Sequence, residues 1–381
     1  MLPEPWKDWS PGVLCESQIE ELYKSGYIEN WIKKDIDGSS FDLHLADEGF
    51  ELLDGTIKPC GADYRYIRVI RNDKLVKEAN RDKNGFYHLK SGTSYVFKIQ
   101  EKLNFKEQDK IYGQATARSS IGRVDVLARL IVDGMDSYEG FTPKCGSGNL
   151  FVEIIPTTFD VKVKKGISVS QLRLFYGDPA KSIVNVDKEN NFDWLISEKG
   201  SCTDFLCVDL RPIKIKGINT SAFCVKDKDR ENFNPIDLWK RKGKFKPSPE
   251  AYWERLEAEK VDKNYRLVIK EGNFFILRSM ERIKLPKGIA VYCRAIDETI
   301  GEMRIHYAGF AHPLFGKDRN DGKDGTPLIF EVRGYGVNVN LKHGEKLATL
   351  IFYRMSKETR KKQKGYNNQE LELSSFFKAW S

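Results

Sequence analysis

Leu150-Phe151-Val152-Glu153-Ile154 recurs later in the chain as Leu328-Ile329-Phe330-Glu331-Val332, at an offset of 178 residues. The same offset separates Gly166 from Gly344, two glycines that each precede a second apolar run. Two independent segments that share one offset are hard to obtain by chance. The sequence therefore predicts a duplicated domain.

Short segments of alternating polar and apolar residues occur along the chain. They include 40–45, 94–99 and 159–163, and Gly, Asp and Pro residues bound them. Alternation with a period of two is typical of half-buried strands, and many short strands separated by turns are typical of a sandwich or barrel. A period near 3.6 predicts a helix at 17–33. We therefore predict a mostly β protein with a few short helices.

The length of 381 residues favours two domains. We expect a first domain at 1–195 and a second at 196–381. Residues 225–263 are rich in charged residues, and we interpret them as an insertion in the second domain that is packed by its own aromatic side chains. A proline at the first helical position predicts a helix that starts at Ser248-Pro249-Glu250.

The composition is that of an ordinary globular chain. The formal net charge of +8 suits a polyanionic ligand, but it equally suits a solvated Lys-rich surface. Seven cysteines without a Cys-x-x-Cys pair favour a reducing compartment. No secretory signal and no stretch of transmembrane length are visible. We expect a soluble cytoplasmic protein that binds neither membrane nor nucleic acid.

The segment at 116–123 (TARSSIGR) places two hydroxyls and two guanidiniums within six residues. Arg118, Ser119, Ser120 and Arg123 can donate several hydrogen bonds to phosphate oxygens, and arginine does so bidentately. A polar turn or a helix cap would have the same composition. Spacing alone leaves both interpretations open.

Glu153 and Glu331 each stand at the centre of an apolar strand. A buried glutamate is unfavourable unless it is paired or protonated, and burial raises its pKa toward the range of general acid–base catalysis. The alternative is an outward-facing side chain on a half-exposed strand. The recurrence indicates a structural or chemical role without saying which.

Two further features bear on the site. The polar tail at 364–369, which contains Tyr366 and Gln369, can fold over a ligand or remain disordered. The stretch His343-Gly344-Glu345 has the His-x-Glu spacing of zinc deaminases, but no Pro-Cys-x-x-Cys accompanies it. We therefore expect no metal ligands in the protein.

Together these segments resemble the dCTP deaminase family of the dUTPase-like superfamily, in its double-length branch. The resemblance is carried by the early strand at 38–45, the RSS loop at 117–123, the glutamate strand at 150–153, the closing segment at 166–175, the stretch at 305–310 and the tail at 366–369. It implies two tandem dUTPase-like β-barrel or jelly-roll domains.

The resemblance also implies roles for individual residues. Ser119 and Arg123 would order a water molecule and Glu153, which would take a proton from that water for attack on C4 of cytosine. The substrate-binding residues would be Arg118, Ser119, Ser120, Gln171, Tyr366 and Gln369, with Arg129 substituting for an arginine that the family has in a nearby hairpin.

The second half departs from the family pattern. It keeps Arg294 and Glu331, but it has Ala295, Ile296 and Thr299 where the first half has two serines and Arg123. This loop is degenerate for phosphate binding. Because sites in this superfamily lie between neighbouring folds, the first-half loop and Glu331 could instead form the working site.

The implied function is hydrolysis of dCTP to dUTP and ammonia, in the supply of dUMP and dTTP. Magnesium would be bound with the triphosphate, and no catalytic zinc would be needed. The alternatives are a bifunctional enzyme that cleaves onward to dUMP and pyrophosphate, and a non-catalytic nucleotide sensor. The resemblance further implies a homo-oligomer with threefold character.

Overall fold

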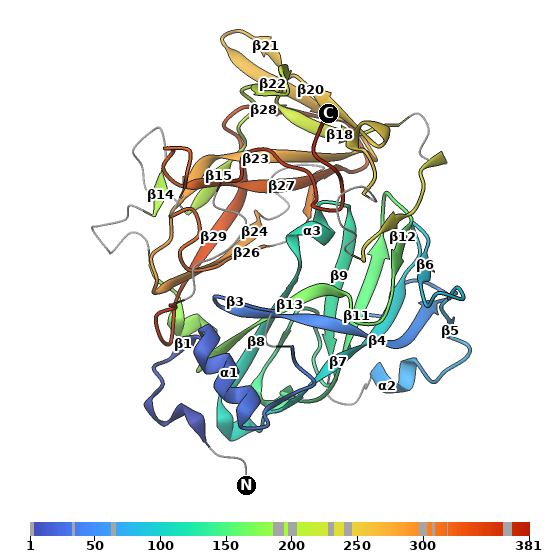
Figure 1. The fold of residues 1–381 in the computed structure, drawn as a ribbon, viewed down its shortest axis with the longest axis vertical. Helices are drawn as coiled ribbons and strands as arrows, with labels where there is room; N and C mark the ends of the chain where they lie inside the picture. The colour runs from blue at the N-terminus through green and yellow to red at the C-terminus, as the bar shows by residue number, and fades with distance from the viewer. Residues whose placement is uncertain are drawn as a thin grey trace.

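The computed structural model describes residues 4–32, 35–61, 66–185, 194–196, 204–227, 232–239, 246–296, 303–306, 309–317, 319–360 and 368–381. The two halves of the chain stack along the long axis of the molecule, with the first half at the bottom in Figure 1. Antiparallel strands dominate both halves, so the predicted mostly β fold is confirmed. No helix among the described residues is long and apolar enough to cross a membrane.

The described residues of the first half form thirteen strands. They are β1 Gly12–Val13, β2 Ile28–Glu29, β3 Ile36–Asp37, β4 Ser40–Leu52, β5 Val76–Glu78, β6 Tyr87–Leu89, β7 Tyr95–Asn104, β8 Ile111–Ala117, β9 Val126–Val132, β10 Gly140–Phe141, β11 Ser147–Pro156, β12 Val161–Val163 and β13 Ser168–Tyr176. Eleven of them form one sheet with the central order β10-β8-β13-β4-β7-β11-β9, which nearly closes into a barrel. The segments predicted as strands at 40–45, 94–99 and 159–163 coincide with or overlap β4, β7 and β12.

Three helices accompany these strands: α1 Glu16–Lys24, α2 Tyr66–Val69 and α3 Ser119–Gly122. α1 is shorter than the helix predicted at 17–33. It ends before Gly26, whose φ of +79° turns the chain so that Ile28 can join the sheet. Its N-cap is Cys15, whose backbone N–H donates to the side chain of Gln18 at 3.1 Å.

The second half repeats the ladder of the first. Its strands are β14 Leu195–Ile196, β15 Phe205–Cys207, β16 Ile213–Ile215, β17 Ile218–Thr220, β18 Ala222–Val225, β19 Ile236–Asp237, β20 Trp253–Leu256, β21 Glu259–Val261, β22 Asn264–Ile269, β23 Phe274–Ile283, β24 Ile289–Ala295, β25 Met303–His306, β26 Gly309–Ala311, β27 Thr326–Gly334, β28 Val339–Lys342 and β29 Lys346–Arg354. In β8–β13, Ala117 pairs with Ser170, and in β24–β29, Ala295 pairs with Ala348. Each residue of the second pair lies 178 positions after its counterpart in the first pair. The offset of the sequence repeat is therefore also the offset between equivalent strand positions.

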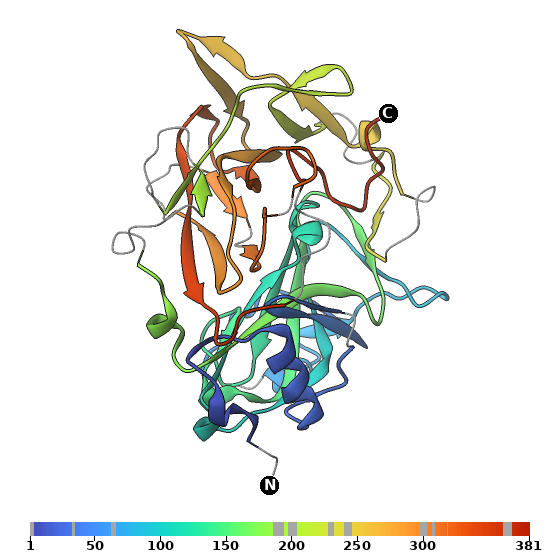
Figure 2. The same cartoon turned by 60° about the vertical axis from the view of Figure 1, so that its left-hand side comes forward.

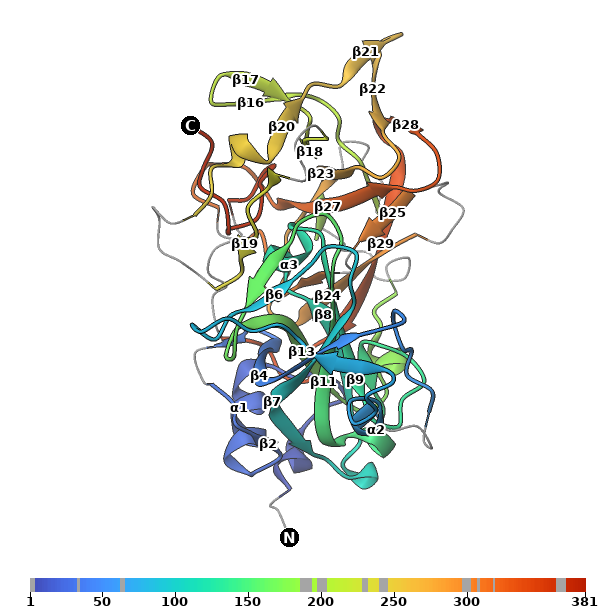
Figure 3. The ribbon, with the colours of Figure 1, turned by 90° about the vertical axis from the view of Figure 1, so that its right-hand side faces the viewer.

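The charged insertion packs through its aromatic residues, but the helix predicted from Ser248 is wrong. A single 3-10 turn at Pro249–Ala251 leads directly into β20, which pairs with β18. Tyr252 and Trp253 are buried against Phe159 of the first half, with ring centroids 5.8 Å away in each case. β19 adds to the edge of β12 (Figure 3), so the insertion holds the two halves together.

Arg173 marks the centre of the contact between the halves. It is fully buried and donates to Val291 O at 3.0 Å and to Ala311 O at 3.4 Å, both in the second half. Its guanidinium lies 3.9 Å from the ring centre of Phe310. Burial lowers the pKa of Arg173 to about 9. These bonds fix how the first-half strands face β24 and β26.

Candidate active site

The loop that contains Arg118, Ser119 and Ser120 lies where the first half meets the second. β8 leads into α3, and β9 follows it, so that α3 faces the second half (Figure 2). The backbone N–H of Arg118 donates to Val169 O at 3.1 Å and fixes the loop on β13. The side chains of Ser119 and Ser120 are half-buried at the start of α3.

A carboxylate orients Arg118. The guanidinium Nη1 lies 2.8 Å from Asp42 Oδ2 on β4. Gln171 is the backbone partner of Asp42 on β13, and its Oε1 accepts a hydrogen bond from Ser40 at 3.3 Å. Burial raises the pKa of Asp42 to about 6, and Arg118 opposes that effect. Two of the residues predicted to bind substrate, Arg118 and Gln171, therefore lie together.

The glutamate that meets this loop is Glu331. It stands on β27 with 5% of its surface exposed, and its carboxylate contacts the backbone of Gly122 so closely that a Cβ there would lie 2.4 Å from Oε2. Burial raises the pKa of Glu331 well above its usual value, and the charge of Asp125 adds to the effect. Arg123 acts in the opposite direction. The structure thus brings Arg123 and Glu331 into one buried cluster.

The C-terminal tail completes this cluster. Gln369 is buried, and its Oε1 accepts a hydrogen bond from Arg123 Nη2 at 2.5 Å. Its Nε2 donates to Pro327 O at 3.1 Å, at the start of β27. Ser374 Oγ donates to Ser120 O at 2.6 Å. Tyr366, the other tail residue predicted to close the site, lies outside the described residues.

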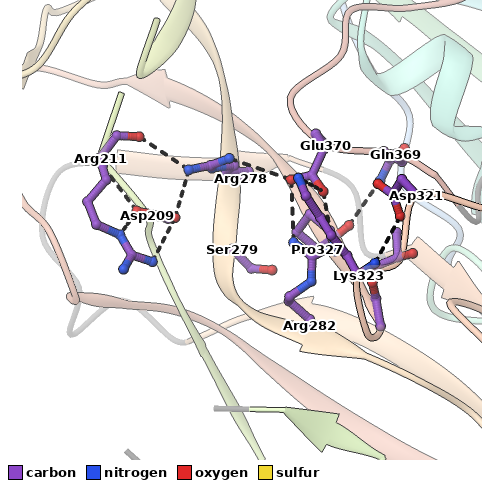
Figure 4. Close-up of polar contacts among 12 residues, drawn as sticks. Asp209, Arg211, Arg278, Ser279, Arg282, Asp321, Lys323, Pro327, Gln369 and Glu370 are labelled. Atoms are coloured by element: carbon purple, nitrogen blue, oxygen red, sulfur yellow. Dashed lines mark hydrogen bonds and ion pairs between the residues drawn. The ribbon is translucent and has the colours of Figure 1, made fainter. Parts of the chain in front are cut away.

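Basic side chains anchor the next tail residue, Glu370 (Figure 4). Its Oε1 accepts hydrogen bonds from Arg282 and Lys323 at 3.0 Å and from Arg319 at 2.9 Å. Arg278 Nη1 lies 3.6 Å from Oε2. Burial would raise the pKa of Glu370, but the hydrogen bonds from Arg282 and Lys323 outweigh it and lower the pKa. This anchor holds Gln369 at its place beside Arg123.

Glu153 lies apart from the loop. It is buried, and its Oε1 accepts from Arg129 Nη2 at 2.5 Å while Oε2 accepts from Tyr138 OH at 3.2 Å. Burial raises the pKa of Glu153, although Arg129 and Tyr138 both oppose the rise. Arg129 is its backbone partner on β9, three residues beyond Val126. At about 3.3 Å per residue, Glu153 is roughly 10 Å from the start of β9.

The structure corrects the alignment of the second-half loop with the first-half loop. The sequence comparison matched Arg294 with Arg118, but the constant shift of the β24–β29 ladder places Arg294 at the position of Thr116. Ile296 therefore takes the place of Arg118. Ala295 takes the place of Ala117, which is not a phosphate-binding residue either. The positions that correspond to Ser119, Ser120 and Arg123 lie outside the described residues, as does Thr299.

Sequence reasoning did not single out three residues beside Glu331. Asp125, Thr158 and Arg333 form a buried polar contact between the halves. The sequence contains a signal for Arg333. Because Arg333 follows Glu331 by two residues in the same strand, the two side chains must lie on the same face of that strand. Within the described ranges, no group of three or more His, Cys, Asp or Glu side chains is placed to hold a metal ion.

Comparisons with known proteins gave matches for both halves of the chain. Residues 10–178 match the family model of the 2'-deoxycytidine 5'-triphosphate deaminase N-terminal domain, and residues 205–377 match that of the C-terminal domain. A similar solved structure is the crystal structure of 2'-deoxycytidine 5'-triphosphate deaminase from Agrobacterium tumefaciens. It has a TM-score of 0.78 and 25% sequence identity, and the match covers 92% of this chain and 97% of that chain. No curated protein sequence gave a match.

Proposed function

Because the chain belongs to the 2'-deoxycytidine 5'-triphosphate deaminase family, we propose that it hydrolyses dCTP to dUTP and ammonia and so supplies pyrimidine deoxynucleotide synthesis. The family resemblance predicted from the sequence is confirmed by the matches of both halves. One observation carries the proposed reaction: the buried carboxylate of Glu331 lies against Gly122 of the loop that has the phosphate-binding residue types.

We assign the role of general base to Glu331 rather than to Glu153. Glu331 lies beside Arg123 and Gln369, whereas Glu153 is occupied by Arg129 and Tyr138. Burial keeps the pKa of Glu331 above its usual value, and a carboxyl whose pKa is raised toward the working pH can both accept and donate a proton in one reaction cycle. The site is therefore a composite of the two halves of one chain.

The chemistry follows from this one carboxylate. Ionised Glu331 accepts a proton from water, and the water oxygen forms a bond to C4 of cytosine. Glu331 passes the proton to N3, then takes the second proton of the former water and delivers it to the amine. The C4–N bond breaks, ammonia leaves, and the C4 carbonyl and the N3–H of uracil remain. One water enters and one ammonia leaves, so the atoms balance. As the family resemblance implies, we expect no catalytic zinc.

The phosphates of the substrate, which we take to be the magnesium complex of dCTP, would bind at the loop. Arg118 would donate to a phosphate in place of, or together with, its present partner Asp42. Ser119 and Ser120 add hydroxyl donors, and Gln171 lies beside Arg118. We propose that the tail closes over the nucleotide through Gln369 and Tyr366, as the family resemblance implies.

Within one chain, this arrangement provides one complete pairing of loop, glutamate and tail. The second-half loop has Ile296 where the first has Arg118, so it offers no guanidinium at that position to a second triphosphate. A homo-oligomer with threefold character, which the family resemblance implies, remains our expectation for assembly. Light scattering on the purified chain measures it directly.

The test compares Glu331→Gln with the matched variant Glu153→Gln. Glutamine keeps the shape of the side chain but cannot accept the proton, so Glu331→Gln should lower kcat by about 10²–10⁴ while dCTP still binds. Glu153→Gln should retain most of the activity. Ammonia and nucleotides are quantified with magnesium present, with and without a zinc-selective chelator.

Each outcome has a distinct meaning. If the wild-type chain releases no ammonia from dCTP, the proposed reaction is wrong. If Glu153→Gln is inactive and Glu331→Gln is active, the base is Glu153. If activity disappears with the zinc-selective chelator, the zinc-free mechanism is wrong. Appearance of dUMP and pyrophosphate beside ammonia would identify the bifunctional alternative.

A further inference from the structure

A buried ion pair joins the two halves directly beside Glu331. Asp125 is fully buried, and its Oδ2 accepts hydrogen bonds from Thr158 Oγ1 at 2.5 Å and from Arg333 Nη2. Arg333 Nη2 also donates to Thr158 Oγ1, and its Nη1 donates to Gly272 O at 2.6 Å. Asp125 and Thr158 belong to the first half, and Arg333 belongs to the second.

This pair lies next to the contact between Glu331 and the loop. Glu331 and Arg333 are alternate residues of β27, so both side chains leave the same face of the strand. On the other side, Gly122 and Asp125 are three residues apart, and Asp125 N–H donates to Gly122 O at 2.8 Å. Two adjacent contacts, Glu331 with Gly122 and Arg333 with Asp125, therefore set β27 against the end of α3.

We propose that Asp125 and Arg333 are positioning residues for deamination, because their ion pair fixes the distance between the catalytic glutamate and the phosphate-binding loop. The inference rests on the proposed function and deepens it. In a composite site, the base and the loop come from different halves, and no strand pairing joins β27 to β9 among the described residues. A misplacement of about 1 Å can lower a rate by about 10².

Several buried polar atoms in the described part of this region lack a hydrogen-bond partner. Among the described residues, Asp125 Oδ1, Arg333 Nε and Arg123 Nε are buried and have no hydrogen-bond partner. Buried polar groups normally find partners in protein or in ordered water. Three such atoms beside Glu331 leave hydrogen-bonding capacity for water or substrate at the place where the proposed mechanism requires a water molecule.

The electrostatics of Glu331 provide a readout that packing alone would not affect. Two charged residues act on Glu331, namely Arg123 and Asp125. Glu331 itself raises the pKa of the Cys293 thiol on β24, and His306 of β25 is a backbone partner of Glu331. Burial has the largest effect on the pKa of Glu331, and the negative charge of Asp125 raises it further. Removing that charge should lower the pKa, so that the ionised base persists to lower pH.

The experiment measures kcat, KM and the pH dependence of ammonia release from dCTP for Asp125→Asn and Thr158→Val. Asp125→Asn keeps the shape but removes the charge. It should lower kcat about 10²-fold with a smaller change in KM, and it should move the acid limb of the kcat profile to lower pH. Thr158→Val is the control, because it removes a hydrogen bond to the same two partners without changing charge. It should leave the acid limb in place.

A second variant keeps the inference testable if Asp125→Asn fails to fold. Arg333→Lys retains the positive charge, but a single ammonium cannot reach Gly272 O and Asp125 together. It should lower kcat about tenfold at an almost unchanged KM, in protein whose folding is checked by its melting curve. Wild-type kcat in Arg333→Lys, or equal shifts of the acid limb in Asp125→Asn and Thr158→Val, would overturn the inference. An inactive wild-type chain would instead contradict the proposed function itself, and this inference with it.

Discussion

Replacing Gly122 with alanine tests the central contact of the proposed site. The added Cβ would lie 2.4 Å from Glu331 Oε2 and 2.9 Å from Cδ, whereas ordinary contacts at a Cβ begin at 3.4 Å. The carboxylate must therefore move by about 1 Å, or the loop must move by the same amount. Because Glu331 is buried, the movement also disturbs the side chains packed around it.

The sign of the change in stability distinguishes Gly122→Ala from an ordinary Gly→Ala substitution in a helix. In a helical position, Gly→Ala normally stabilises a protein by roughly 0.5–1 kcal/mol. Here overpacking should reverse the sign and destabilise the fold by about 1–3 kcal/mol. A shift of about 1 Å between the base and the loop should lower kcat by about 10², which corresponds to about 2.7 kcal/mol in the activation barrier.

The assay is steady-state ammonia release from dCTP together with a thermal melt. Gly288→Ala is the matched control, because its Cβ would meet nothing closer than Glu358 at 3.9 Å, and it should behave as wild type. Adding Glu331→Asp to Gly122→Ala shortens the clashing side chain, so the melting temperature should recover while kcat does not. Wild-type kcat with a raised melting temperature in Gly122→Ala would refute the contact between Glu331 and the loop.

Three further predictions concern the phosphates, the base and the tail. Arg118→Ala should weaken dCTP binding by roughly 10–100-fold and leave deoxycytidine binding almost unchanged, because the lost charge-assisted hydrogen bonds reach only phosphate; calorimetry with both ligands measures the difference. Because burial raises the pKa of Glu331, kcat should fall on the acid side at a pH clearly above the ordinary glutamate value of about 4.3, and an acid limb near pH 4 would contradict this. Glu370→Gln should raise KM for dCTP by roughly 3–10-fold, because the tail loses its charged anchor and Gln369 loses its fixed position. The effect on KM is small because the carboxylate is partly exposed, and an unchanged KM would count against the anchor.

Much of the fold could be predicted from local patterns. Alternation identified the strands that became β4, β7 and β12 because one face of each lies on a core. The helix expected from Ser248 failed because tertiary pairing overrode a local signal. The proline started only one turn, and Trp253 joined a strand beside β18, where its ring packs against Phe159. Aromatic residues favour such half-buried strand positions.

The site could be predicted only in part. The loop was visible because its donors are contiguous in the sequence. Its partner was not, because Glu153 and Glu331 have the same apolar surroundings and only the packing of the halves selects between them. The mismatch of Arg294 with Arg118 has a similar cause. Both residues are arginines, and this similarity suggests that Arg294 corresponds to Arg118. The hydrogen-bonded strand pairs show instead that the residue corresponding to Arg118 is Ile296, two positions later.

The two halves differ in their loops and in the surroundings of their glutamates. The repetition of a glutamate therefore does not imply a second active site. In the site that we propose, the loop comes from one half and the glutamate from the other. The second-half loop has Ile296 in place of Arg118, and the glutamate of the first half is enclosed by Arg129 and Tyr138. That enclosure gives Glu153 a structural reason to remain, since removing its charge would leave the guanidinium of Arg129 without its carboxylate partner. Under the proposed mechanism, the two glutamates therefore have different roles: Glu331 acts on the substrate, and Glu153 pairs with Arg129.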